Sequence, residues 1–218
     1  NKIKWIKKID DINYGPIIFI GNEFFDSLPI KQVIKKKKLF FEKHVGLTNN
    51  NKSLKFLYKK ANNNLVKNIK KLNIISNGSV IEYPIESIKY LISISKKINK
   101  FNGALLTFDY GYKEKMNYDS LQSIKKHKYS NSLVNPGNID ITSHINFRLF
   151  NEILKKNNLS VKKIVTQNKF LRTMGIVERA NILSKKMTFK QKADMFFRLK
   201  RLLDFNEMGN LFKVLLAQ

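Results

Sequence analysis

Residues 15–29 read Gly-Pro-Ile-Ile-Phe-Ile-Gly-Asn-Glu-Phe-Phe-Asp-Ser-Leu-Pro, and this stretch decides the fold. The apolar run 16–20 contains β-branched and aromatic residues between two glycine turns, which is typical of a strand buried on both faces. Polar residues follow the strand directly, from Asn22 to Asp26. Open α/β sheets bind their ligands outside the carboxyl ends of their strands, so we expect a functional site here.

A helix and a second buried strand follow the same pattern further along the chain. Apolar residues recur with helical spacing over 85–98, and Phe101-Asn102-Gly103 then breaks the helix. Residues 103–108 read Gly-Ala-Leu-Leu-Thr-Phe, a second buried strand, with Asp109-Tyr110-Gly111 as a polar turn after it. A strand, a helix and another strand in this order predict an α/β fold with parallel strands.

The remaining elements are expected to form around this framework. One or two exposed strands are predicted over 31–47, with the lysine run 35–38 as a turn, and residues 48–73 carry few core signals and predict a variable insertion. The other expected elements are a short strand at 79–81, a polar loop at 112–143, a helix at 147–157, a strand at 161–165, helices at 169–186 and 189–205 ended by Gly209, and a closing strand at 211–216.

The composition limits the classes of partner. The chain of 218 residues has 42 basic and 16 acidic residues, a net charge of +26. Nearly all the basic residues are lysine, and the chain is also rich in asparagine and isoleucine. This combination favours the bias of an AT-rich genome over a dedicated nucleic-acid surface, which would use more arginine. Non-specific binding of nucleic acid at low salt is expected.

Cysteine usage and hydropathy exclude further classes. The chain has no cysteine, which excludes disulfides, thiolate metal sites and a cysteine nucleophile. It shows no membrane span or signal peptide, so the cytoplasm is the expected compartment. The first residue is Asn1 rather than methionine and an apolar run follows early, which predicts a piece of a longer protein.

The polar residues after the first strand are the leading site candidate. A carboxylate there can bind a guanidinium through paired hydrogen bonds, or accept a proton from a nucleophilic nitrogen. Glu23 and Asp26 are three residues apart, so both would face one side if a helical turn follows. A helix N-cap explains the same residues about equally well.

Two further groups of polar residues are weaker candidates. Gly111 in Asp109-Tyr110-Gly111 would allow a ligand close to the backbone, although a simple turn is the commoner interpretation. The loop from Asp119 to Asn146 holds two of the three histidines, but their spacing matches no metal motif, so hydrogen-bonded scaffolding or substrate contact is favoured over a metal site.

These residues together resemble the MidA-like family of S-adenosylmethionine-dependent methyltransferases. The sequence 22–29, followed by Gln32, resembles the family signature NEFFDALP. Further matches follow in the same order, at 78–82, 109–111, 119–122 with His127, 136–144, 166–167 with 170–171, 175–176 with Arg179, and 208–209 with 212–213. Three positions depart from the family pattern: the early Glu-x-Gly-x-Gly loop is not among these residues, Asn146 replaces an aspartate and Ser27 replaces an alanine.

The resemblance implies a fold and a division of the chain. It implies an α/β class I methyltransferase fold of Rossmann-like type with a mixed sheet, of which this chain is the C-terminal portion. Residues 1–30 and 78–218 would belong to that domain, and 31–77 would be an inserted hairpin and helical part that binds substrate.

The resemblance also implies S-adenosyl-L-methionine as cofactor and protein arginine methylation as activity. The acceptor would be a protein such as a respiratory complex I subunit, and a eukaryotic source would place the protein in the mitochondrial matrix. Two other functions stay open: a non-catalytic assembly factor and an RNA-modifying methyltransferase. The implied site residues are Glu23, Asp26 and Asn22 for catalysis, Gly21 and Asn22 for the cofactor, and Asp109, Tyr110, Gly111, Gln122, His127, Asp140, Thr142 and His144 for the acceptor; no metal is expected.

Overall fold

The computed structural model describes residues 3–50, 52–75, 80–114, 119–125 and 128–218. The chain divides into two compact units. The first comprises residues 1–23, 94–111 and 154–218, and the second comprises residues 24–93 and 112–153. Both boundaries of the insertion expected from the sequence, at 31 and 77, lie inside the second unit.

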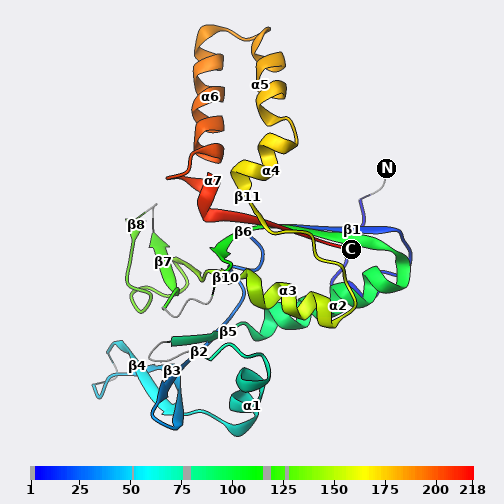
Figure 1. Cartoon of the computed structure of the whole chain (residues 1–218). Coiled ribbons are helices and arrows are strands. Elements are labelled where there is room, and N and C mark those ends of the chain that lie inside the picture. Colours follow the sequence, from blue (N-terminus) through cyan, green and yellow to red (C-terminus); the bar gives the residue numbers. More distant parts are fainter. Residues whose placement is uncertain (1–2, 51, 76–79, 115–118, 126–127) are drawn as a thin grey trace. The chain divides into compact units, whose positions relative to one another are not determined.

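The first unit contains a mixed sheet with the strand order β1-β6-β12-β11 (Figure 1). β1 (Ile17–Asn22) pairs in parallel with β6 (Gly103–Tyr112), and Ile17 lies opposite Gly103. β12 (Phe212–Ala217) is antiparallel to β6 and also pairs with the short β11 (Val165–Thr166). The predicted α/β fold with a parallel strand pair is confirmed, and β12 makes the sheet mixed. The prediction that β1 is buried on both faces is wrong, because Ile18 and Ile20 on one face are 71% and 72% exposed.

Local backbone chemistry explains the sharp entry into β6. Asn102 has a φ of 57° and Gly103 a φ of 157°. A Cβ atom on Gly103 would lie 1.8 Å from the carbonyl oxygen of Ile17. The two strands therefore approach each other at a point that only glycine permits, which fixes the register of β1 against β6.

Two sequence predictions about the first unit are wrong in detail. Asp109-Tyr110-Gly111 is not a turn after the strand, because β6 continues to Tyr112 and the side chain of Asp109 is completely buried. Gly209 lies inside the short helix α7 (Met208–Leu211) instead of ending the preceding helix. A Cβ atom there would lie 2.3 Å from the carbonyl oxygen of Leu203.

The helices after β11 form a hairpin that the sequence predicted in outline. α4 (Gln167–Thr173) and α5 (Ile176–Ser184) replace the single helix expected over 169–186, because Gly175 between them has a left-handed φ of 78°. α6 (Phe189–Leu203) begins with a capping box between Thr188 and Gln191. Figure 1 shows α5 and α6 running beside each other. Val161 makes one bridge with Ala217, so the strand expected over 161–165 is reduced to that bridge and β11.

The second unit is built on a four-stranded antiparallel sheet with the order β4-β3-β2-β5. Its strands are β2 (Lys31–Lys36), β3 (Leu39–Leu47), β4 (Leu54–Lys60) and β5 (Val80–Tyr83). β2 and β3 confirm the strands predicted over 31–47, with the turn at the end of the lysine run. The predicted exposure of these strands is wrong for β2, because Gln32 and Val33 are buried.

One face of this sheet is covered by α1 (Asn63–Lys71), which Asn62 caps through a hydrogen bond from the Leu65 N–H. Leu65 and Ile69 pack there in one core. Residues 48–73 therefore contain a strand and a helix of the core, and the expectation of few core contacts is wrong. The helix was not predicted because α1 has few apolar residues and they stand among lysines and asparagines, which makes the helical spacing hard to recognise in the sequence.

The rest of the second unit holds short strands and aromatic packing. β7 (Gln122–Lys125), β8 (Lys128–Tyr129) and β9 (Asp140–Thr142) form a small sheet within the predicted loop 112–143, and β10 (Ile145–Asn146) follows. The ring of Phe25 lies 5.0 Å from those of Phe24 and Phe150. Other elements are the 3-10 helix η1 (Ile9–Asp11) and the predicted helices α2 (Ile85–Phe101) and α3 (Phe147–Lys156), whose ends belong to different units.

None of the helices in the described ranges has both the length and the hydrophobicity that a bilayer crossing requires.

A core substitution tests the packing of α1 on its sheet. Ile69→Ala should lower the free energy of unfolding by about 2–5 kcal/mol, because Ile69 is completely buried and its truncation leaves a cavity. Leu39→Ala is the matched control and should cost less than about 0.5 kcal/mol, because that side chain is 52% exposed. Denaturant titration followed by circular dichroism measures both. Equal losses in the two variants would contradict the packing.

Candidate functional site

The second unit contains a cleft of about 380 Å³, within the range of roughly 300–1,000 Å³ that is typical of ligand pockets. Residues 26–30, which follow the two phenylalanines of the family signature, line one part of it. Lys43, Val45 and Phe56 line it from β3 and β4, and residues 141–143 complete it from the end of β9 and the residue after it. Apolar side chains and polar or charged side chains contribute about equally to its lining.

Asp26 is placed in this cleft by aromatic anchors beside it in the sequence. Phe25 is buried against Phe150, and the Leu28 N–H donates to the Phe25 carbonyl at 3.3 Å. The Asp26 carbonyl accepts a hydrogen bond from the Ser143 N–H at 3.0 Å. Asp26 is only 4% exposed. A carboxylate held in this way can accept hydrogen bonds from a cationic ligand in a partly desolvated setting.

A hydrogen-bond network supports the cleft from the sheet. Gln32 is buried, and its amide Nε2 donates to Glu82 Oε1 at 2.8 Å and to Asp119 Oδ1 at 2.5 Å. Lys43 Nζ donates to Gln32 Oε1 at 2.9 Å and to Asp119 Oδ2 at 2.8 Å. Lys43 also lies 4.1 Å from the ring centre of Phe56. The network therefore holds Lys43 and Phe56 in place in the cleft.

Ser120 joins this network to the loop before β10. Its hydroxyl donates to Glu82 Oε2 at 2.5 Å and its N–H donates to Glu82 Oε1 at 2.9 Å. The Ser120 Oγ accepts from the His144 N–H at 2.9 Å. The Glu82 carboxylate thus connects β5 to β2 and to the segment of Ser120, which are distant in the sequence.

The two carboxylates of the network have opposite pKa shifts. Burial raises the pKa of Glu82 above its ordinary value of 4.5, against the effect of the hydrogen bonds from Ser120 and Gln32. Burial would also raise the pKa of Asp119, but hydrogen bonds from Lys43 and Gln32 and the Lys43 charge outweigh it and lower that pKa below 3.8.

The predicted site residues of the first unit lie at two strands. Gly21 and Asn22 are the last residues of β1, and Glu23 follows with a φ of 47° and an N–H that donates to the Phe108 carbonyl at 2.9 Å. Asn22 and Glu23 are exposed. No helical turn follows, so Glu23 and Asp26 do not share the face of a helix and differ in exposure.

The triplet 109–111 belongs to the same unit but is largely interior. Asp109 Oδ1 accepts from the Tyr110 N–H at 3.0 Å, and the Tyr110 ring lies 5.4 Å from that of Phe212. Gly111 is half-buried. The acceptor role of these three residues stays a prediction.

The predicted acceptor residues of the second unit lie on the small sheet and the loop after it. Gln122 of β7 faces Thr142 of β9, and its Nε2 donates to Thr142 Oγ1 at 3.4 Å. Thr142 lines the cleft together with Asp26. Asp140 is exposed, and His144 is half-buried. His127 lies outside the described residues.

Several residues of the cleft and of the hydrogen-bond network that supports it were missed as site candidates in the sequence. Gln32 and Glu82 had appeared only as parts of the family resemblance, and Lys43 and Phe56 carried no signal at all. Antiparallel pairing brings them together, because Gln32 lies opposite Glu82 in β2 and β5. The long separation between these strands in the sequence hid that register.

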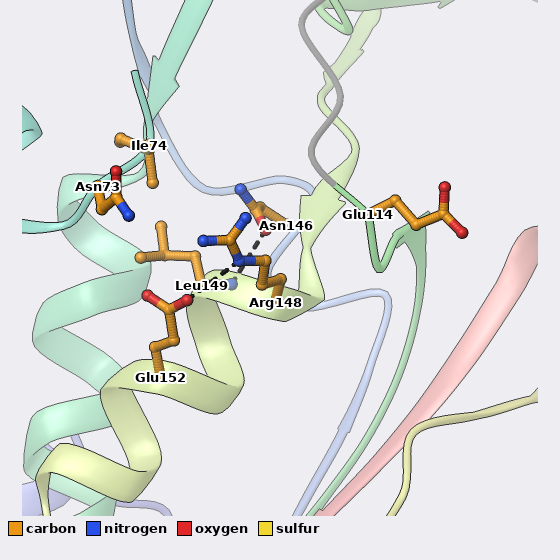
Figure 2. Close-up of a pocket in the computed structure, with 7 residues that line it drawn as sticks. All are labelled: Asn73, Ile74, Glu114, Asn146, Arg148, Leu149 and Glu152. Atoms are coloured by element: carbon orange, nitrogen blue, oxygen red, sulfur yellow. Dashed lines mark hydrogen bonds and ion pairs between the residues drawn. The ribbon is translucent and has the colours of Figure 1, made fainter. Parts of the chain in front are cut away.

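The departure at Asn146 has a structural explanation. Asn146 Oδ1 accepts a hydrogen bond from the Leu149 N–H at 3.0 Å and so caps the start of α3 (Figure 2). Asparagine and aspartate cap helices about equally well. Arg148 and Glu152 form an ion pair at 3.1 Å on the next turn. The position requires a capping oxygen, and a charge is not needed for that.

Within the described ranges, no three histidine or acidic side chains gather as a metal site would require. The residues at the end of β1 fit a contact with S-adenosylmethionine. Gly21 lets a ligand approach the backbone, and the exposed side chain of Asn22 offers a hydrogen-bond donor and an acceptor. In the same described ranges, no strand enters a helix through a glycine-rich turn.

The class of protein follows from this combination of fold and signature. The family described as "Putative S-adenosyl-L-methionine-dependent methyltransferase" matches residues 1–165. The chain belongs to this family, and the resemblance found in the sequence is confirmed.

Particular relatives are similar to nearly the whole chain. "Protein arginine methyltransferase NDUFAF7 homolog, mitochondrial" of Caenorhabditis elegans is 31% identical over 97% of this chain and 49% of its own length. "Protein arginine methyltransferase NDUFAF7, mitochondrial" of Xenopus tropicalis is 28% identical over 96% of this chain and 48% of its own length. The chain thus spans about half the length of these relatives.

Solved structures support the fold. A Burkholderia thailandensis protein bound to S-adenosyl-homocysteine superimposes with a TM-score of 0.79 at 21% identity, covering 99% of this chain and 56% of that protein. A native crystal structure of a superfamily protein from the same organism has a TM-score of 0.80 at 21% identity, covering 99% and 58%. The class I methyltransferase fold predicted from the sequence is therefore confirmed.

The raised pKa of Glu82 predicts a pH dependence of stability. The folded state keeps the Glu82 proton to a higher pH than the unfolded state, so stability falls as pH rises from 4.5 through the raised pKa. Glu82→Gln should remove this part of the slope. The lowered pKa of Asp119 makes stability fall as pH decreases below 3.8, which is the opposite direction and lies below the pH range of the Glu82 effect. Denaturant midpoints from pH 4 to 8 measure the difference; parallel profiles would contradict it.

The cap at Asn146 gives a second prediction for stability. Asn146→Asp should leave the unfolding free energy within about 0.5 kcal/mol, because aspartate also accepts the Leu149 N–H and suits a helix N-terminus. Asn146→Ala should cost about 1 kcal/mol. Thermal and denaturant unfolding of both variants test this, and an alanine as stable as the wild type would rule out the cap.

Proposed function

We propose that this chain forms the acceptor-binding part of an S-adenosylmethionine-dependent methyltransferase that acts on arginine side chains of a protein. The observation that carries the proposal is the burial of Asp26, from the family signature, in a cleft of ligand size. The names of the relatives support arginine as the acceptor. Their compartment supports a mitochondrial location for a eukaryotic source, and a respiratory complex I subunit is the proposed acceptor protein.

The chemistry requires alignment of the acceptor nitrogen. S-adenosylmethionine supplies an electrophilic methyl group, and transfer forms an N–C bond, breaks the C–S bond and releases a proton from the acceptor nitrogen. A guanidinium is a weak nucleophile because its lone pair is delocalised. Asp26 would accept hydrogen bonds from the guanidinium, hold its plane and concentrate its positive charge away from the reacting nitrogen. The same carboxylate can take up the released proton.

Other residues of the cleft would position the acceptor. Thr142 offers a hydroxyl, and Leu28, Val45 and Phe56 offer apolar surface for the methylene groups of an arginine. Lys43 would not compete for Asp26, because its ammonium group is held by Asp119 and Gln32. Glu23 and Asn22 at the end of β1 remain proposed catalytic residues, and Gly21 and Asn22 remain proposed cofactor contacts.

Substitution of Asp26 tests the proposal. In the complete gene product, Asp26→Asn should reduce methyl transfer to arginine peptides by about 10²-fold or more, because the amide cannot balance the charge or take the proton. Asp10→Asn, a change of an exposed carboxylate, is the matched control and should leave the rate unchanged. Mass spectrometry of the peptide products measures both.

The outcome also separates the competing functions. Equal rates in Asp26→Asn and the wild type would remove Asp26 from the mechanism. Absence of methyl transfer in the wild type, with intact binding of acceptor protein, would favour a non-catalytic assembly factor. Transfer to RNA instead of protein would favour the RNA-modifying alternative.

A further inference from the structure

The four-stranded sheet of the second unit has one face that its helix does not cover. Side chains alternate along each strand, so Val33 and Phe40 point to the core with α1 and their neighbours point to the opposite face. We define the open sheet face by Ile34, Phe41, Val45, Leu47, Leu54, Phe56 and Tyr58, which the strand registers place on that side. Val45 is 55% exposed, Leu47 54% and Tyr58 48%.

The open sheet face is continuous with the proposed acceptor cleft. Val45 and Phe56 are opposite each other in β3 and β4, and both also line the cleft that holds Asp26. Leu47 and Leu54 form the next pair along the same strands. A chain whose side chain enters the cleft would therefore meet this apolar surface on leaving it.

The exposed charged residues of these strands beside the open sheet face are lysines. Lys36 lies 6.0 Å from the ring centres of both Phe41 and Tyr58, and Lys60 lies opposite Phe41. The sheet has two acidic residues: Glu42 points to the other side and is paired with Lys31 at 2.5 Å, and Glu82, which lies on the side of Gln32, accepts hydrogen bonds from Gln32 and Ser120. Lys43 is neutralised by Asp119. The face thus combines exposed apolar side chains with lysines, which suits a partner that is apolar and acidic.

We infer that the open sheet face binds the acceptor protein through an extended segment of alternating acidic and apolar residues beside the target arginine. The inference rests on the proposed function for the identity of the cleft. A second copy of this chain would bring the same lysines together and be repelled. The face is thus a recognition surface that selects the sequence around the modified residue.

A polypeptide fits this face better than a nucleic acid. The two most exposed side chains of the face, Val45 and Leu47, are aliphatic and offer no plane on which a base could stack, and Tyr58 is the one aromatic side chain of the face that is exposed. Lys36 lies close to the rings of Phe41 and Tyr58. These strands contain no arginine, the residue that nucleic-acid readers use most.

Fluorescence anisotropy with a defined probe tests the inference in the complete gene product without cofactor. The probe is a labelled nine-residue peptide with a central arginine flanked by alternating glutamate and valine or leucine. The double variant Leu47→Glu, Tyr58→Glu changes two exposed side chains of the face that do not line the cleft. It should weaken binding by about tenfold or more, because it removes two apolar contacts and repels the probe. Ile182→Glu, on the 65% exposed Ile182 of α5, is the matched control and should bind as the wild type does.

The alternatives give different results. A probe with lysine in place of each glutamate should bind at least about tenfold more weakly. Equal binding by the wild type and the double variant, or an equal loss in Ile182→Glu, would overturn the inference. Displacement of the peptide by an oligouridine at stoichiometric concentration would also overturn it and assign the face to nucleic acid.

The test is separate from that of the proposed function. Methyl transfer that depends on Asp26 but not on Leu47 and Tyr58, with unchanged peptide binding, would overturn the docking surface and leave the methyltransferase proposal intact. Peptide binding that depends on Leu47 and Tyr58 in a protein without methyl transfer would support the docking surface and reject the enzyme.

Discussion

The hydrogen bonds of the Gln32 amide are the constraint on which the second unit depends. A buried amide that bridges two carboxylates, Glu82 and Asp119, requires every donor to be placed, because an unsatisfied group in this setting costs about 1–3 kcal/mol. Lys43 satisfies the remaining amide oxygen. Gln32 thus links β2 to β5 through Glu82, reaches Asp119 and orients Lys43, and Glu82 in turn holds Ser120. These hydrogen bonds support the walls of the cleft.

The fold could be predicted where a local pattern determined the structure. The apolar run before Asn22, the helical spacing over 85–98 and Gly103 specified β1, α2 and the start of β6. α1 and β4 could not be recognised, because their apolar residues are few and stand among lysines and asparagines whose abundance obscures periodicity. The turn assigned to residues 109–111 failed for another reason: a buried aspartate inside a strand is uncommon, and its hydrogen bond to Tyr110 cannot be read from the sequence.

The sequence predicted the motif of the candidate site but not the residues from other strands that surround it. The signature 22–29 pointed to Asp26, and the structure shows Phe25 anchoring it beside the cleft. It also shows that Glu23 and Asp26 belong to different units, a division that three-residue spacing does not reveal. Lys43 and Phe56 come from strands that carry no motif, so their part in the cleft depends on pairing between distant segments. Asn146 caps the start of α3 with its side-chain oxygen, a role that comparison with the family signature does not reveal.

The central claim is that the cleft beside Asp26 receives an arginine side chain. Because the chain has no cysteine, Ser27→Cys places a single thiol at the exposed residue next to Asp26 in the cleft. Its alkylation by iodoacetamide, followed by mass spectrometry, can be compared with that of Asn181→Cys in α5, with and without a saturating arginine peptide. The account predicts that the peptide slows alkylation at residue 27 and leaves residue 181 unaffected. An unchanged rate at residue 27 while the peptide is bound would place the acceptor elsewhere and contradict the account.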